Sequence, residues 1–168
     1  SYCPRERIPN HMDLALFKSI VEESTCFGPR SFSLHLFGEP LLYPYWREAV
    51  SFIKSQNKDH VVLLTTNGTK INEVINDLVS VGIDQIFWTW RPEAHFTPET
   101  KEKLRRWGKF RVRFIAEITP PEAYEEWKGW RNVEKRPLHN YANEIDVAKF
   151  GAGNFLPKKR YPCYHLYY

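Results

Sequence analysis

Short apolar runs alternate along this chain with segments of roughly ten residues that have helical spacing, and this alternation limits the fold most strongly. The run VVLLTT at 61–66 is continuously apolar at its start, as in a strand that is buried on both faces. Asn67 and Gly68 end it, and a helical pattern follows over 71–81. Strands that alternate with helices in this way predict βαβ units and a parallel sheet.

The same alternation continues on both sides of that run. It predicts strands at 32–37, 83–90, 110–118 and 133–138, and helices at 13–23, 45–56, 97–107 and 120–129. Asp13 has the residue type of an N-cap for the first helix. We therefore expect an α/β fold with a barrel-like sheet, either closed or open.

Composition sets broad limits on the class of protein. The chain has 168 residues, of which 42% are hydrophobic and 26% charged, with a net charge of +4, as expected for one globular domain. It has no apolar run near the roughly 20 residues that span a membrane, and no secretory signal is visible. Three widely spaced cysteines make a disulfide framework improbable, so we expect a reducing, cytoplasmic setting with Cys26 as a small buried residue.

The stretch Gly38-Glu39-Pro40 follows a predicted strand, at the end of a parallel sheet where ligands bind. Gly38 would let a ligand approach the backbone, Glu39 supplies a negative charge, and Pro40 stiffens the turn. These residues suit a ligand that carries an ammonium group. The alternative is that Glu39 is a solvated turn residue.

Two further predicted strands place polar groups at the same end of the sheet as Glu39. Asn67 follows the strand at 61–66. On the next strand, Thr89 shares one face with Phe87 and Arg91, and its hydroxyl could meet a ribose there. On the strand at 110–118 one face is apolar and consists of Val112, Phe114, Ala116 and Ile118, while the other carries Arg111, Arg113, Ile115 and Glu117. Charges on an interior strand are costly unless they are paired or bind something.

The chain resembles the radical S-adenosylmethionine (radical SAM) enzymes with a SPASM- or twitch-type C-terminal extension. The segment SYCPRERIPNHMD is similar to the end of the family's CxxxCxxC cluster motif, with Tyr2 at the aromatic position before Cys3. LHLFGEPLLYP, LLTTNGT and DQIFWTW resemble the family's second, third and fourth strands in the right order. RPLHNYAN and RYPCYHLYY resemble, more loosely, the segments that lead into an auxiliary-cluster region.

The resemblance implies a partial (β/α)6 barrel over 1–140 that lacks its first strand, followed over 141–168 by the start of the extension. It implies that Cys3 binds a [4Fe–4S] cluster, that Cys163 is the first ligand of an auxiliary [4Fe–4S] cluster, and that Tyr2 packs by the adenine. The S-adenosylmethionine (AdoMet) contacts implied for the other positions are the methionyl ammonium for Glu39 with its neighbours Gly38 and Pro40, the ribose for Thr89, an unspecified contact for Asn67, and the methionyl carboxylate or the substrate for Arg113.

The implied activity is reductive cleavage of AdoMet to a 5′-deoxyadenosyl radical, which abstracts hydrogen from a peptide, a protein or a small molecule. An electron donor such as a flavodoxin or ferredoxin is implied as well. The other cluster cysteines of the family would precede Ser1, so we expect the chain by itself to be an inactive fragment. Arg91-Pro92 also departs from the acidic residue and glycine that usually end the fourth strand.

The competing hypothesis is a non-catalytic binding module for single-stranded nucleic acid. The basic and aromatic stretch 101–114, with Lys158, Lys159 and Arg160, has the residue types that hold single strands by charge and stacking. Placement separates the two hypotheses. Arg111 and Arg113 on the concave face of the sheet favour the enzyme, whereas an exposed basic stripe continuous with the preceding helix favours nucleic acid.

Overall fold

The computed structural model describes residues 11–35, 38–116 and 118–136. Within them, one sheet has five strands in the order β1-β2-β3-β4-β5, and every neighbouring pair is parallel. The strands are β1 (Ser31–Ser33), β2 (Val61–Thr66), β3 (Gln85–Thr89), β4 (Phe110–Ile115) and β5 (Val133–Arg136). Each strand pairs with the next one along the chain, so the predicted parallel α/β sheet is confirmed.

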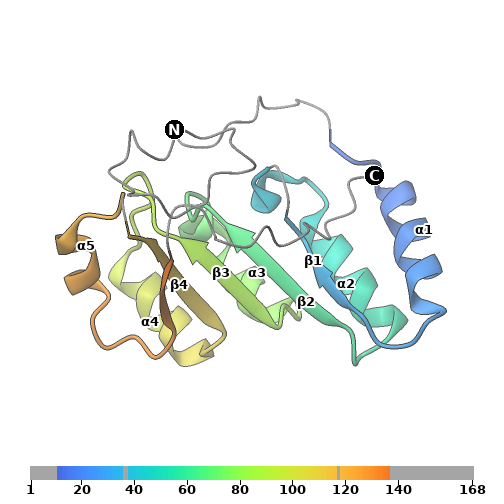
Figure 1. Ribbon diagram of the computed structural model, residues 1–168. Coiled ribbons are helices and arrows are strands. Elements are labelled where there is room, and N and C mark those ends of the chain that lie inside the picture. The colour runs from blue at the N-terminus through green and yellow to red at the C-terminus, as the bar shows by residue number, and fades with distance from the viewer. Residues whose placement is uncertain (1–10, 36–37, 117, 137–168) are drawn as a thin grey trace, which may run out of the picture.

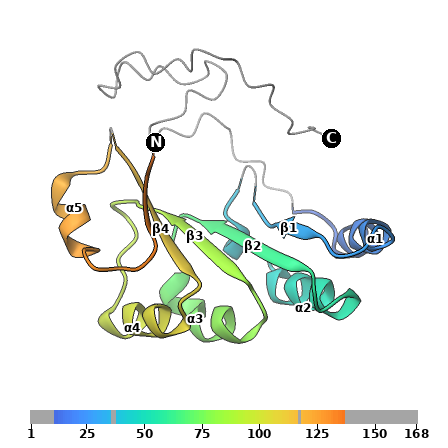
Figure 2. The same ribbon diagram turned by 60° about the horizontal axis from the view of Figure 1, so that its bottom comes forward.

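Helices connect the strands and cover one side of the sheet. They are α1 (Leu14–Thr25), the 3-10 turn η1 (Pro40–Leu42), α2 (Trp46–Gln56), α3 (Ile71–Ser80), α4 (Pro98–Trp107) and α5 (Pro121–Glu126). Helices α2, α3 and α4 lie together on one face of the sheet, while α1 lies beside the edge of the sheet that β1 forms (Figures 1 and 2). None of the described helices covers the opposite face (Figure 2), which we call the helix-free face.

Local sequence signals explain where several helices begin and end. The Asp13 side chain accepts the backbone N–H groups of Ala15 at 2.8 Å and Leu16 at 3.0 Å, so the predicted N-cap of α1 is confirmed. Thr97 caps α4 in the same way by accepting the Thr100 N–H at 3.1 Å. These side chains satisfy N–H groups that have no partner inside the helix.

The hydrophobic core lies between the sheet and helices α2, α3 and α4. Alternate strand residues point into it, because successive side chains of a strand point to opposite faces. The buried apolar strand residues are Val62, Leu64, Ile86, Trp88, Phe110, Val112 and Phe114, and the buried helix residues include Val50, Ile53, Ile71, Leu78 and Leu104. The core therefore fixes which side chains point to the helix-free face.

Strand β2 differs from the expectation of burial on both faces. Val62 and Leu64 are fully buried, but Val61 is 40% exposed and Leu63 is half-buried. The reason is that the described helices cover one side of the sheet only. The apolar run is thus a core strand on one side and part of the helix-free face on the other.

The ends of two strands also differ from the predictions. The ladder of β1 ends at Ser33, although the Leu34 N–H still reaches the Leu63 carbonyl at 2.8 Å. Strand β4 ends at Ile115 rather than 118, because the N–H groups of Ile118 and Thr119 both donate to the Ile115 carbonyl and close a turn. The predicted apolar face therefore stops at Phe114, and Ala116 is exposed. Glu117 lies outside the described residues.

Candidate cofactor-binding site

Glu39 lies in the loop after β1 and joins that loop to the end of β2. Its Oε1 accepts the Leu41 N–H at 3.2 Å, at the start of η1, and the Thr66 hydroxyl at 2.7 Å. Its Oε2 accepts the Asn67 N–H at 2.6 Å. The carboxylate is therefore directed into the protein, and it is not the solvated turn residue that was the alternative interpretation.

The electrostatic state of Glu39 follows from these contacts. Burial raises the pKa of the carboxyl above its usual value, although the hydrogen bonds from Asn67, Thr66 and Leu41 lower it in part. A carboxylate offers about four lone-pair positions, so three internal donors leave room for one more. A cationic donor placed there would favour the charged form of Glu39.

Asn67 is held through its backbone as well as its side chain. Its N–H donates to Glu39, and its carbonyl accepts the indole N–H of Trp88 at 3.0 Å. Its side-chain oxygen accepts the N–H of Thr69 at 2.9 Å and the Thr69 hydroxyl at 2.8 Å. The turn between β2 and α3 is therefore fixed from two neighbouring segments of the chain.

Gly68 is required in this turn for two reasons. Its φ is +86°, and a Cβ at this position would lie 2.7 Å from Trp88 Cδ1 and 3.1 Å from Phe96 Cε1. By contrast, a Cβ on Gly38 would meet no atom of the described residues within 4 Å. The chain is thus tightly packed at Gly68 and open at Gly38, where the sequence predicts a close approach of a ligand to the backbone.

Thr65, Phe87 and Thr89 lie on the helix-free face near the carboxyl ends of their strands. The register places Thr65 beside Phe87 and Thr89 beside Arg113. The Thr65 hydroxyl oxygen is buried and has no hydrogen-bond partner among the described residues. A buried hydroxyl without a partner fits a face that takes up a polar ligand.

Three arginines surround one glutamate on the same face. Arg113 Nε lies 3.2 Å from Glu134 Oε2, Arg136 Nη2 lies 2.8 Å from the same oxygen, and Arg111 Nη1 lies 3.7 Å from Glu134 Oε1. Arg113 also stacks on Phe87, with its guanidinium carbon 3.6 Å from the ring centroid. We call Arg111, Arg113, Arg136 and Glu134 the arginine cluster.

The contacts within the arginine cluster shift the pKa values of Arg113 and Glu134. Burial and the neighbouring charges of Arg136 and Arg111 lower the pKa of Arg113, against the opposing effect of Glu134. Burial opposes ionisation of Glu134, but Arg136 and Arg113 outweigh it and hold the pKa of that carboxyl below its usual value. The glutamate is therefore an anion shared among cations.

The basic residues of α4 are separate from this cluster. Their ion pairs are Lys101 with Glu126, Lys103 with Glu99, and both Arg105 and Arg106 with Glu102. Helix α4 covers the face of the sheet opposite to Arg111 and Arg113 (Figure 2). The described residues therefore form no basic stripe that continues from α4 to β4, which disfavours the single-stranded nucleic-acid hypothesis.

Several predicted site residues lie outside the described residues, namely Tyr2, Cys3 and Cys163. Among residues 11–35, 38–116 and 118–136, no group of three or more His, Cys, Asp or Glu side chains could hold a metal ion. No helix in those ranges is long and apolar enough to cross a membrane. The expectation that Cys26 is buried is wrong, because it caps the exposed end of α1.

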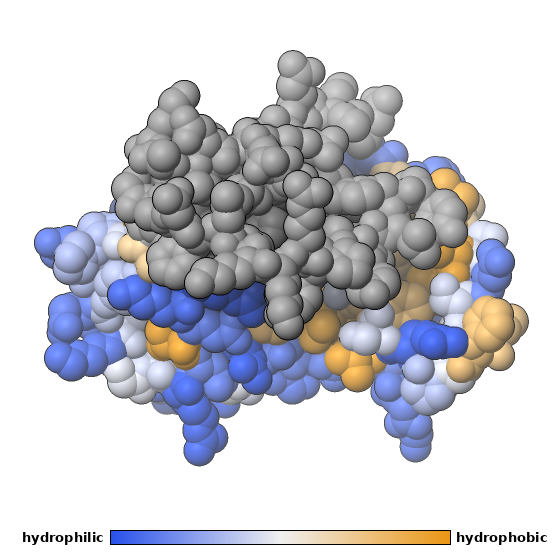
Figure 3. Space-filling model, viewed as in Figure 1, coloured by the Kyte–Doolittle hydropathy of each residue, from blue (hydrophilic) through white to orange (hydrophobic). Residues whose placement is uncertain are grey.

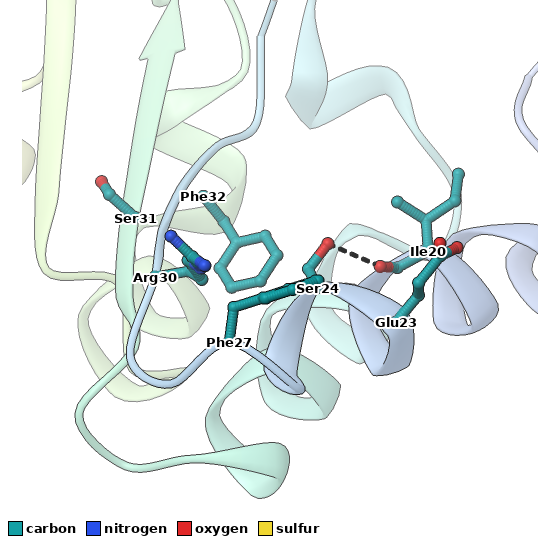
Figure 4. Close-up of a pocket in the computed structure, with 7 residues that line it drawn as sticks. All are labelled: Ile20, Glu23, Ser24, Phe27, Arg30, Ser31 and Phe32. Carbon is teal, nitrogen blue, oxygen red and sulfur yellow. Dashed lines mark hydrogen bonds between the residues drawn. The ribbon is translucent and has the colours of Figure 1, made fainter.

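A surface hollow of about 460 Å³ lies elsewhere, between the end of α1 and the amino end of β1. The ring of Phe32 lies between the strand and α1, and Phe27 and Arg30 come from the connecting turn (Figure 4). Apolar side chains are also exposed along α1 (Figure 3), including Leu16 and Ile20, and Met12 is exposed just before the helix. This hollow is at the opposite strand ends from Glu39 and Asn67.

Comparison with solved structures gives the fold. The chain is similar to a crystal structure of BtrN in complex with AdoMet and 2-DOIA, with a TM-score of 0.53, 24% identity, and coverage of 70% of this chain and 52% of that chain. It is also similar to SeMet BtrN in an open conformation, with a TM-score of 0.51, 26% identity, and coverage of 69% and 53%. The fold is a partial (β/α)6 barrel of the radical SAM type.

The chain spans about half the length of these BtrN chains. No family model matches the sequence, and no curated protein matches it significantly. The radical SAM-type sheet places Glu39 and Asn67 in contact, whereas Thr89 and Arg113 neighbour each other on the helix-free face.

Sequence reasoning missed five residues of this region, namely Thr65, Thr66, Trp88, Glu134 and Arg136. Thr66 and Trp88 hold Glu39 and Asn67, and Glu134 holds the arginine cluster. Thr66 stands directly before Asn67 at the end of an apolar strand, which is a signal that could have found it. Trp88 and Glu134 gave no local signal, because their contacts cross 21 positions of sequence.

Proposed function

We propose that this chain is part of a radical SAM enzyme and binds AdoMet at the carboxyl ends of its strands. The observation that carries the proposal is its structural likeness to BtrN, whose solved complex contains AdoMet. The loops after β1 and β2 meet at Glu39 and Asn67 at those strand ends, which is where ligands bind in parallel sheets.

The proposed contacts use groups that the described residues leave available. Glu39, with one lone-pair position left, and the open backbone at Gly38 would receive the methionyl ammonium. Pro40, in the first turn of η1, holds this loop. Thr89 would contact the ribose, the Thr65 hydroxyl supplies a further polar group, and Asn67 lies beside Glu39. Arg113 lies at the edge of the same region, next to Thr89.

The redox part of the proposal depends on residues outside the described ranges. Cys3 would bind the [4Fe–4S] cluster, Tyr2 would pack by the adenine, and Cys163 would begin an auxiliary site in a SPASM-like extension over 141–168. When bound, the cluster supplies the electron for reductive cleavage of AdoMet, with a flavodoxin or ferredoxin as the donor. The substrate would be a peptide, a protein or a small molecule.

Equilibrium dialysis of labelled AdoMet against the full chain tests the proposal. We expect saturable binding that Glu39→Gln and Thr89→Val weaken by roughly tenfold, the effect of one charged or polar contact. Glu125→Gln, on the exposed surface of α5, serves as the matched control and should bind as the wild type does. Absence of saturable AdoMet binding to the folded wild-type chain would refute the proposal.

A further inference from the structure

The arginine cluster lies on one side of the sheet because of the strand register. Arg113 pairs with Glu134, and Ile115 pairs with Arg136, so the side chains at 111, 113, 134 and 136 all point to the helix-free face. Figure 2 shows that the helices α2, α3 and α4 lie on the opposite side. A ligand on the helix-free face would meet all three guanidinium groups.

The cluster has more positive than negative charge. Three arginines and one glutamate give the cluster a formal charge of +2. In the part of the chain that the structure describes, Glu134 is the only carboxylate within ion-pair distance of these arginines. One arginine would suffice to pair Glu134, so a purely structural role leaves the other two without an explanation.

The three arginine side chains of the cluster differ in their exposure to solvent. Arg113 is 18% exposed, Arg111 38% and Arg136 55%. Arg113 is held between the Phe87 ring and Glu134, while the Gln85 amide oxygen can accept from Arg111 Nε. Guanidinium groups bind carboxylates and phosphates through two parallel hydrogen bonds, and less entropy is lost when the guanidinium is already oriented.

We propose that the arginine cluster binds an oxyanion of the substrate, a phosphate or a carboxylate, beside the AdoMet site. This inference rests on the proposed function, and it names the substrate as an anionic molecule. Arg111 and Arg136 provide the accessible donors, and Arg113, which stacks on Phe87, positions Glu134. A nucleic-acid backbone is disfavoured because the described basic residues of α4 lie on the other face and are paired with acids.

The variant Glu134→Gln distinguishes an anion-binding role of the arginine cluster from a purely structural role. The glutamate competes with the incoming oxyanion for the same donors, so Glu134→Gln should strengthen anion binding while it weakens the native contacts of the sheet. Arg136→Gln and Arg111→Gln should weaken anion binding. Arg106→Gln, on the exposed face of α4, is the matched control for loss of one positive charge.

The experiment titrates the full chain with inorganic phosphate and, separately, with acetate, at constant ionic strength, and follows β4 and β5 amide signals by NMR. We expect saturable binding, a loss of about tenfold in affinity for Arg111→Gln and Arg136→Gln, no loss for Arg106→Gln, and a gain of about threefold for Glu134→Gln. Preference for phosphate identifies a phosphorylated substrate, and equal or stronger binding of acetate identifies a carboxylate.

Two results would overturn the inference. One is anion binding that does not saturate or that the Arg111 and Arg136 variants leave unchanged. The other is competition between phosphate and AdoMet, which would assign the cluster to the methionyl carboxylate. Labelled AdoMet is therefore titrated in parallel. If the wild-type chain binds the anion but not AdoMet, only the proposed function is refuted. If it binds AdoMet but not the anion, only the anion site is refuted.

Discussion

The carboxylate of Glu39 accepts the backbone N–H of Asn67 at 2.6 Å and thereby joins the loop after β1 to the end of β2. The same carboxylate accepts the Thr66 hydroxyl, so two consecutive residues of one strand end depend on one side chain 27 or 28 positions earlier. The residue expected to meet a ligand therefore also builds the site around it.

Glu39→Gln should destabilise the fold even without any ligand. The glutamine NH2 group would face the Asn67 N–H or the Thr66 hydroxyl, and a buried donor left unpaired costs roughly 1–3 kcal/mol. Urea denaturation measures the free energy of unfolding. Glu48→Gln, which removes an exposed pair with Lys18, is the control and should cost less than about 1 kcal/mol. Equal losses in the two variants would contradict the structural role of Glu39.

Gly68→Ala should cost more than the same change at another glycine with the same backbone angle. Both Gly68 and Gly28 have a φ of +86°. A Cβ would meet Trp88 and Phe96 at Gly68, but at Gly28 it would meet no described atom within 4 Å. We expect a loss of about 1–2 kcal/mol for Gly28→Ala from the backbone alone. Overpacking should add roughly 1–3 kcal/mol for Gly68→Ala. Identical urea midpoints would show that Trp88 moves aside without cost.

Trp88→Phe should loosen the turn that contains Asn67. The variant keeps an aromatic ring in the core but removes the indole N–H that binds the Asn67 carbonyl at 3.0 Å. A loss of roughly 1–3 kcal/mol is expected from the unpaired carbonyl and the smaller ring. Hydrogen exchange of the Asn67 and Gly68 amides should quicken in this variant, and it should stay at the wild-type rate in the control Trp107→Phe on α4. Unchanged protection of Asn67 would reject this role for Trp88.

Asp84 should make the stability depend on pH in the acidic range. Burial opposes its ionisation, but the Lys54 ammonium at 2.5 Å and the Val62 N–H at 2.7 Å outweigh this effect and hold the pKa of Asp84 below its usual value. A depressed pKa means that the stabilisation is complete above the unfolded-state pKa and is lost as the pH falls through the folded-state pKa. The free energy of unfolding should therefore decrease as the pH falls below about 4.

Asp84→Asn and Lys54→Met test this assignment. Each variant removes one partner of the ion pair, so each should show a shallower decrease of the unfolding free energy in acid than the wild type. Urea titrations at several pH values below neutrality measure the slope. A slope that neither variant changes would place the acid sensitivity in other carboxyl groups.

Local patterns were sufficient for much of the fold. The continuous run at 61–66 became β2 with the predicted bounds, and the helix expected at 45–56 is α2 from Trp46 to Gln56. Asp13 is the N-cap of α1 as predicted, because a cap depends only on residues two and three positions away. The alternation on β4 correctly separated Arg111 and Arg113 from Val112 and Phe114 as far as Ile115, where the Thr119 turn ends the strand.

The sequence by itself determined the order of strands and helices and the strand ends that carry Gly38, Glu39 and Asn67, because periodicity and caps are properties of neighbouring residues. Only the tertiary structure decided that Glu39 is bound by Thr66 and Asn67, that Trp88 holds the Asn67 carbonyl, and that Glu134 meets Arg113. Those contacts depend on strand register and on how far each side chain reaches across the sheet, and residues more than 20 positions apart carry no local pattern that reports it.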